Sequence, residues 1–148
     1  MTRQARSIKT MKCLSQEEIE ANLRQAGVNP TAQRIAICQF VLCDADHPTA
    51  EDVKAWADKN FPKMSMATVY NTLGTLVNAG LLKEFKFPHT GKVIYDNNLT
   101  KHYHFYDEGT GMLTDIPSDQ IDVKSPLFKS LKITEIDVVI RGRKGRNF

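Results

Sequence analysis

The amino-acid sequence predicts an α+β fold, in which an N-terminal winged-helix lobe is followed by a smaller α/β lobe. Four segments before residue 81 carry apolar residues at helical spacing, each behind a residue type that caps helices. From Leu82 onward apolar residues alternate, so the hydrophobic period falls from about 3.6 residues to 2. The 148-residue chain is 41% hydrophobic and 25% charged, which is typical of a folded soluble protein.

Each of the four predicted helices starts at a side chain that can accept a hydrogen bond from a first-turn amide. These N-caps are Ser15, Thr31, Thr49 and Ser65. Glu18 completes a capping box with the first of them, and Gly27 and Gly80 are expected to end the first and fourth helices. Cys38 falls on the apolar side of the second helix and is expected to be buried.

Two strands, Leu82–Phe87 and Val93–Tyr95, are expected to form a hairpin around the turn Pro88-His89-Thr90-Gly91. Short helices followed by a hairpin make a winged helix, in which the helix before the hairpin enters the DNA major groove. The exposed side of that fourth helix is expected to be polar without acids, whereas a merely solvated face would normally carry Glu and Lys. Its residues are Met66, Thr68, Tyr70, Asn71, Thr72 and Thr75.

The segment from Tyr95 to His104 contains residue types that bind metal ions, two histidines and an aspartate. His102 and His104 are spaced i, i+2 in an aromatic stretch that favours a strand, so both imidazoles should lie on one face. Asp96 precedes His102 by six residues, and Asp115 follows His104 by eleven. Imidazoles with carboxylates suit a nitrogen and oxygen metal site, although a His-x-His pair is also common as a surface or packing feature.

Four sequence blocks resemble the ferric uptake regulator superfamily, in the family's order, between about Ser15 and Pro117. The blocks are NPTAQRIAI, HPTAEDV, SMATVYNTLGTLVNAGLL and DNNLTKHYHF. The Asp96–His102 and His104–Asp115 spacings are similar to those of the peroxide regulators. The sequence Asp-Ile-Pro at 115–117 and the ending IDVVIRGRKGR look more like the iron response regulators. The sequence is therefore consistent with either the peroxide regulators or the iron response regulators.

The resemblance implies a basic tail over residues 1–14, a winged-helix DNA-binding domain over 15–95, and a dimerisation and metal-sensing domain over 96–148 with a basic C-terminal tail. It also implies one divalent metal per chain, Fe(II), Mn(II) or Zn(II), at a regulatory site. The ligands carried over from the family are His47, Asp96, His102, His104 and Asp115, the last expected at the end of its strand. The residues expected to bind DNA are Asn29, Thr31, Gln33, Arg34, Ser65, Thr68, Tyr70 and Asn71.

Two further elements are expected in the second domain. Ile136, Val138 and Ile140 alternate within residues 133–140, which predicts a strand whose apolar face serves a homodimer. Ser125 and Pro126 are expected to start a helix.

The chain departs from the family pattern at the structural zinc site. Typical members follow the histidines with C-x-x-C, but Asp107 and Thr110 stand at those positions, and no cysteine follows Cys43. We therefore expect no structural cysteine-bound zinc, and an ordinary turn over residues 107–111. Cys13 is followed by Leu14 and not by proline, so the haem-binding Cys-Pro motif of some iron response regulators is missing.

The expected function is that of a metal-dependent dimeric transcription regulator, a repressor of iron-homeostasis or peroxide-stress genes that binds double-stranded promoter DNA. The chain is expected to be cytoplasmic, because it has neither a signal peptide nor a membrane segment. A haem-status-responsive regulator is one alternative, and a winged-helix protein-interaction module with a vestigial metal site is another. A hydrolytic metalloenzyme is disfavoured, since no base or substrate cleft is evident.

Overall fold

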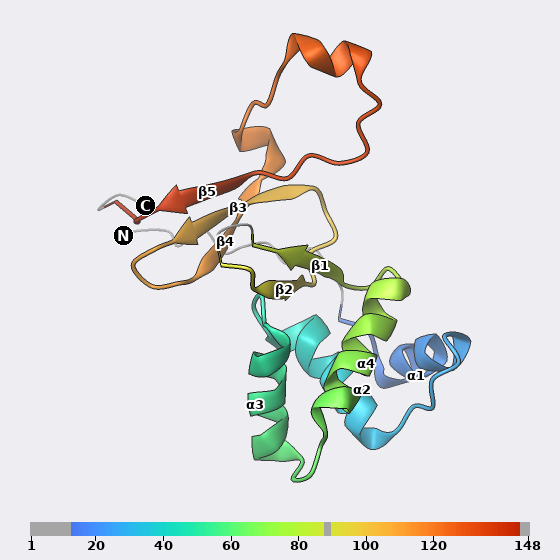
Figure 1. Cartoon of the computed structure of the whole chain (residues 1–148). Helices are drawn as coiled ribbons and strands as arrows, with labels where there is room; N and C mark the ends of the chain where they lie inside the picture. Colours follow the sequence, from blue (N-terminus) through green and yellow to red (C-terminus); the bar gives the residue numbers. More distant parts are fainter. Residues whose placement is uncertain (1–12, 88–89, 146–148) are drawn as a thin grey trace. The chain divides into compact units, whose positions relative to one another are not determined.

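The computed structural model describes residues 13–87 and 90–145, which divide between Leu99 and Thr100 into two compact units. Over its described residues, the first unit contains four α-helices, a π-helical turn and a two-stranded antiparallel hairpin (Figure 1). In chain order these are α1 (Gln16–Gln25), α2 (Ala32–Gln39), η1 (Phe40–Asp44), α3 (Ala50–Asn60), α4 (Met66–Asn78), β1 (Lys83–Lys86) and β2 (Val93–Asp96). The predicted helices and hairpin strands are confirmed, while Pro88 and His89 of the predicted turn lie outside the described residues.

Local hydrogen bonds explain where the helices begin, and all four predicted N-caps are confirmed. The Ser15 hydroxyl accepts from the Glu18 amide, while the Glu18 carboxylate accepts from the Ser15 amide at 2.7 Å. Thr49 and Asp52 form the same reciprocal pair at the start of α3. The remaining caps, Thr31 and Ser65, each accept from the amide three residues later. Each such cap contributes about 1 kcal/mol to helix stability.

The core of the first unit is formed by the apolar faces of the helices. Cys38 is 0% exposed, as predicted, and burial raises the pKa of its thiol to about 12. Thr72 was expected on the exposed side of α4, but this prediction is wrong because its side chain is also fully buried. Its hydroxyl donates to the Thr68 carbonyl oxygen at 2.7 Å, so a polar side chain is buried with its donor satisfied.

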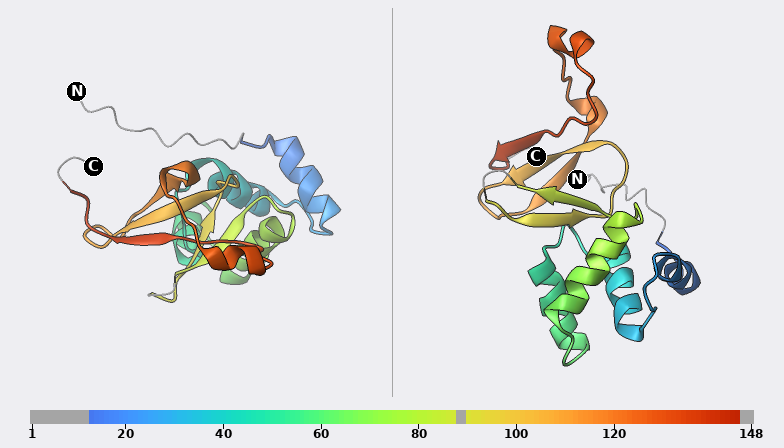
Figure 2. Two further views of the ribbon diagram at one scale, coloured as in Figure 1. Left: turned by 90° about the horizontal axis from the view of Figure 1, so that it is seen from above. Right: turned by 45° about the vertical axis from the view of Figure 1, so that its right-hand side comes forward.

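The second unit is built on a three-stranded sheet. Its strands are β3 (His102–Asp107), β4 (Leu113–Pro117) and β5 (Val139–Gly142), in the order β4-β3-β5. β3 pairs antiparallel with β4 and parallel with β5, so a long connection must return the chain between β4 and β5. This connection extends away from the sheet and carries two short 3₁₀ turns, η2 (Ser118–Gln120) and η3 (Pro126–Ser130) (Figures 1 and 2).

Two predictions about the second unit need correction. The strand expected over residues 133–140 begins only at Val139, because the parallel register with β3 reaches no further back than the pair His104–Val139. Alternating apolar residues without a hydrogen-bonding neighbour do not make a strand, and Ile133 is 40% exposed. The helix expected at Ser125 starts there, with the Ser125 hydroxyl accepting from the Leu127 amide, but ends as a 3₁₀ turn at Ser130.

The turn between β3 and β4 forms where the family carries cysteines, as predicted. The Asp107 carboxylate accepts from the Gly109 amide at 2.9 Å, and the Gly111 amide donates to the Asp107 carbonyl at 2.7 Å. The Gly109 hydrogen bond is the main reason that the pKa of Asp107 lies below its ordinary value, against the opposing effect of burial. A carboxylate therefore closes this turn. None of the described helices is long and apolar enough to cross a bilayer.

Candidate metal centre and DNA-binding surface

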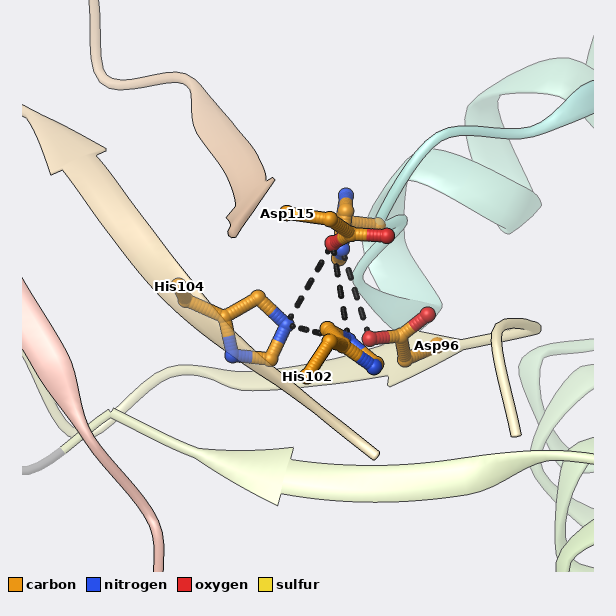
Figure 3. Close-up of side chains that lie close together, drawn as sticks. Asp96, His102, His104 and Asp115 are labelled. Carbon is orange, nitrogen blue, oxygen red and sulfur yellow. Dashed lines mark hydrogen bonds and ion pairs between the residues drawn. The ribbon is translucent and has the colours of Figure 1, made fainter. Parts of the chain in front are cut away.

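Strand pairing in the second unit assembles three of the predicted metal ligands. His102 and His104 are separated by one residue on β3, so their side chains share a face, as predicted. Asp115 lies directly opposite His104 in the antiparallel register, in the middle of β4 and not at its end as expected. Figure 3 shows the His104 imidazole turned toward both His102 and the Asp115 carboxylate.

The distances among these three side chains fit a shared metal ion. The two Nε2 atoms are 3.1 Å apart, and Asp115 Oδ1 lies 3.5 Å from Nε2 of His102 and 3.6 Å from Nε2 of His104. Ligand bonds of about 2.1 Å at tetrahedral or octahedral angles put neighbouring donor atoms roughly 3.0–3.4 Å apart. The His102 Nδ1 donates to the Thr100 carbonyl at 2.7 Å, which leaves its Nε2 lone pair for a cation.

The first unit holds the other two predicted ligands close together. His47 lies in the loop before α3, and Asp96 is the last residue of β2; His47 Nε2 and Asp96 Oδ2 are 3.4 Å apart. Both side chains are largely buried, with 10% and 4% exposed. The His47 Nδ1 donates to Asp46 Oδ1 at 2.6 Å, and its Nε2 faces the Asp96 carboxylate. In a neutral ring this Nε2 carries a lone pair, and a lone pair and a carboxylate oxygen at that spacing suit a cation between them.

Interactions that the sequence did not predict hold this pair in place. The Tyr95 amide donates to the Pro48 carbonyl at 2.9 Å, which ties β2 to the loop carrying His47. The Asn97 side-chain amide donates to the carbonyls of Val41 and Leu42, at 3.1 and 3.2 Å. These carbonyls lie in the last helical turn, where the carbonyls no longer have amide partners within the helix. His47 itself has a left-handed backbone (φ 47°), a strained conformation that is common at functional sites.

The predicted DNA-binding residues form two groups in the first unit. The group before and in the first turn of α2 is tied together locally. The Arg34 guanidinium donates to the Asn29 carbonyl at 2.8 Å, and the Arg34 amide donates to the Thr31 hydroxyl. Thr31 and Asn29 are exposed, while Gln33 and Arg34 are half-buried.

The second group lies on the N-terminal half of α4. The Ser65 and Thr68 hydroxyls are 3.0 Å apart, Tyr70 is 47% exposed, and Asn71 is also exposed. The Tyr70 hydroxyl donates to a carboxylate oxygen of Glu51 at 3.2 Å. Partial burial, and to a smaller extent this bond, raises the pKa of Tyr70 above its ordinary value. Glu51 was not predicted from the sequence as a functional residue, although the predicted N-cap Thr49 puts Glu51 in the first turn of α3.

The basic tails are described only in part. Arg141, Arg143 and Lys144 are exposed in the C-terminal part of the second unit. The other basic tail residues lie outside the described residues: Arg3, Arg6, Lys9, Lys12 and Arg146.

The helices and hairpin of one unit and the histidine and aspartate side chains of the following sheet unit are consistent with the class that sequence similarity supports, metal-responsive transcription regulators and not enzymes. Residues 25–140 match the ferric uptake regulator family. The chain is 34% identical to the peroxide-responsive repressor PerR of Staphylococcus epidermidis over 122 residues, which cover 82% of this chain and 79% of that one. The protein therefore belongs to the ferric uptake regulator family, and the resemblance read from its motifs is confirmed.

Solved structures agree with the predicted fold class. The PerR of Streptococcus pyogenes is 29% identical, with a TM-score of 0.51 over 91% of this chain and 95% of that one. The ferric uptake regulator of Helicobacter pylori has a TM-score of 0.66 over 93% of this chain and 97% of that one. It is only 14% identical, so this likeness concerns the fold alone.

Proposed function

We propose that the protein is a homodimeric repressor that binds double-stranded promoter DNA according to the state of one divalent metal ion per chain. The proposed ligands are His47 and Asp96 of the first unit with His102, His104 and Asp115 of the second. Each of the five offers one ligand atom. The proposed DNA contacts come from the start of α2 and from α4.

The observation that carries this proposal is the division of the ligands between the two units. In each unit the donor atoms are 3.1–3.6 Å apart, so each forms part of a coordination shell. One ion bound by both parts would restrict the angle between the units. In a symmetric dimer that angle sets the separation of two α4 helices, which must match successive major grooves about 34 Å apart. Metal binding and DNA binding are then coupled, because the ion binds best in the DNA-competent arrangement.

The donor set constrains the metal by its chemistry. Nitrogen and oxygen donors accept Fe(II), Mn(II) and Zn(II), with intrinsic affinity highest for zinc, so occupancy in the cell follows metal availability. A structural zinc held by cysteines is not part of this proposal, since Asp107 closes the turn where the family carries thiolates.

Within this function, we propose that the signal is hydrogen peroxide. The 34% identity to a protein named as a peroxide-responsive repressor favours this proposal. By the family resemblance, peroxide regulators carry aspartate at the position of Asp115, where iron-uptake regulators more often carry glutamate. Held by these residues, Fe(II) would supply the redox chemistry that activates peroxide and would not be consumed in the net reaction. The net reaction would add one oxygen atom to a ligand imidazole and release water, after which the weakened imidazole no longer holds the units together. A regulator that responds to iron or haem status is the competing proposal.

The test is duplex binding by chelator-treated protein, with Fe(II), Mn(II), Zn(II) or haem added back. We expect Mn(II) or Fe(II) to restore binding in the wild-type protein and not in His104→Ala, whereas the exposed-site control Asp122→Asn behaves as wild type. Peroxide should abolish binding only with Fe(II), and mass spectrometry should then find one added oxygen on His47, His102 or His104. Binding that responds to haem, or Fe(II)-loaded protein that peroxide leaves unchanged, would favour the competing proposal.

A further inference from the structure

We propose that Glu51 determines which DNA base Tyr70 reads, by accepting the proton of the Tyr70 hydroxyl and leaving that oxygen only as an acceptor. This inference rests on the proposed DNA binding and adds to it a specificity residue outside α4.

The geometry brings these two side chains together from different helices. Tyr70 projects from α4 and Glu51 from the first turn of α3, and the two helices pack against each other. The capping box of Thr49 and Asp52 fixes the backbone of that turn, so the Glu51 side chain starts from a defined position. The hydroxyl donates to Glu51 at 3.2 Å, beside an open hollow of about 850 Å³ that both residues line.

A carboxylate oxygen only accepts hydrogen bonds, so the single hydroxyl proton of Tyr70 must point toward Glu51. The phenolic lone pairs then face outward and can accept a hydrogen bond but cannot donate one. In the major groove the donors are the amino groups of adenine and cytosine, whereas guanine and the thymine oxygen present acceptors. Phosphate oxygens are acceptors as well. Tyr70 paired with Glu51 therefore suits adenine or cytosine and is poorly suited to the backbone.

Without Glu51 the hydroxyl can rotate and donate. It would then accommodate guanine, thymine or a phosphate, and discrimination at that base pair would fall. The charge of Glu51 has a separate effect, since a carboxylate near DNA weakens binding to every sequence alike. Glu84 lines the same hollow from β1 and provides a control for charge alone.

The experiment selects duplexes from a library randomised across the half-site, using metal-loaded full-length protein. The variants are Glu51→Ala and Glu84→Ala, each alone and combined with Tyr70→Phe, which keeps the ring and removes the hydroxyl. We expect Glu51→Ala to lose about fivefold preference for adenine or cytosine at one position per half-site, the equivalent of one hydrogen bond. Glu84→Ala should raise affinity for all duplexes and leave that preference intact.

The decisive result is the combination with Tyr70→Phe, because Glu51→Ala should then change no base preference. A preference that survives in Glu51→Ala, or one that still shifts when the hydroxyl is absent, overturns the inference while leaving the proposed function in place. If the wild-type protein binds no duplex with any metal, the proposed function fails and this inference fails with it. Because both glutamates are exposed, thermal melting should show that every variant folds like the wild type.

Discussion

Replacing Asn97 by alanine should weaken both the first unit and its part of the metal site. The Asn97 amide has two hydrogens, and its two shorter bonds go to the carbonyls of Val41 and Leu42 at 3.1 and 3.2 Å. The contact with Ala45, at 3.5 Å, lies at the limit of a hydrogen bond and is left out of the sum. Two lost bonds at about 1 kcal/mol each lower the free energy of unfolding by about 2 kcal/mol. That is roughly a thirtyfold change in the folding equilibrium.

The same substitution should weaken metal binding. Asn97 adjoins Asp96 and bonds to the segment that leads into His47, so it holds the two ligands in register. Groups that hydrogen-bond directly to a ligand side chain contribute about 10- to 100-fold to metal affinity, and Asn97 acts only through the backbone, so we expect a loss of about 10-fold. Mn(II) and Zn(II) affinities from chelator competition, together with urea unfolding of metal-free protein, measure the two effects separately. Asn78→Ala, at an exposed position at the end of α4, is the matched control and should change stability by less than about 0.5 kcal/mol.

Two outcomes would contradict this account of Asn97. Unfolding free energies that agree within about 0.5 kcal/mol between Asn97→Ala and Asn78→Ala would mean that the carbonyls are satisfied in another way. A stability loss with unchanged metal affinity would restrict Asn97 to a structural role.

The titration of Asp107 gives a second prediction. The pKa of Asp107 is lowered in the folded state, so its ionised form stabilises the fold. This contribution to stability is fully present above the ordinary carboxyl pKa and is lost as the pH falls through the lowered pKa. Below about pH 4, the free energy of urea unfolding should therefore fall less steeply with pH for Asp107→Asn than for the wild type. The exposed neighbour Glu108→Gln is the control and should behave as the wild type. An equal fall in all three proteins would refute the role of this carboxylate. Cysteine reactivity gives a third: iodoacetamide at neutral pH should label exposed Cys13 and spare Cys38, whose buried thiol has a pKa raised to about 12. Peptide mapping that finds rapid labelling of Cys38 would mean that α2 opens in the native state.

Local interactions could be predicted from the sequence, and this covers most of the first unit. Caps such as Ser15 and Thr49 act on amides three residues away, so spacing alone identifies them. The shared face of His102 and His104 follows in the same way from the two-residue period of a strand. The registers between elements could not be predicted. That Asp115 lies opposite His104 depends on how the turn after Asp107 closes, which composition does not determine.

Contacts between distant segments were missed for the same reason. Asn97 bonds to carbonyls 55 and 56 residues earlier in the chain, and no spacing rule connects them. Thr72 was misplaced because helical periodicity gives the direction of a side chain but not whether its hydroxyl can return to a carbonyl four residues back. The metal ligand set and the DNA contacts remain predictions from the family resemblance.

The π-helical turn η1 holds an extra residue in the segment before His47. The Ala45 amide donates to the Phe40 carbonyl at 2.8 Å, five residues back, so this turn holds one residue more than an α-helical turn. The wider turn completes nearly the same rotation as an α-helical turn, so loss of one residue here would convert η1 to α-helical hydrogen bonding with little change in the direction of the chain beyond it. The same deletion within α2 would instead rotate everything beyond it by roughly 100° about the helix axis. The segment between α2 and His47 can therefore lose one residue in η1 while the pair His47 and Asp96 stays together.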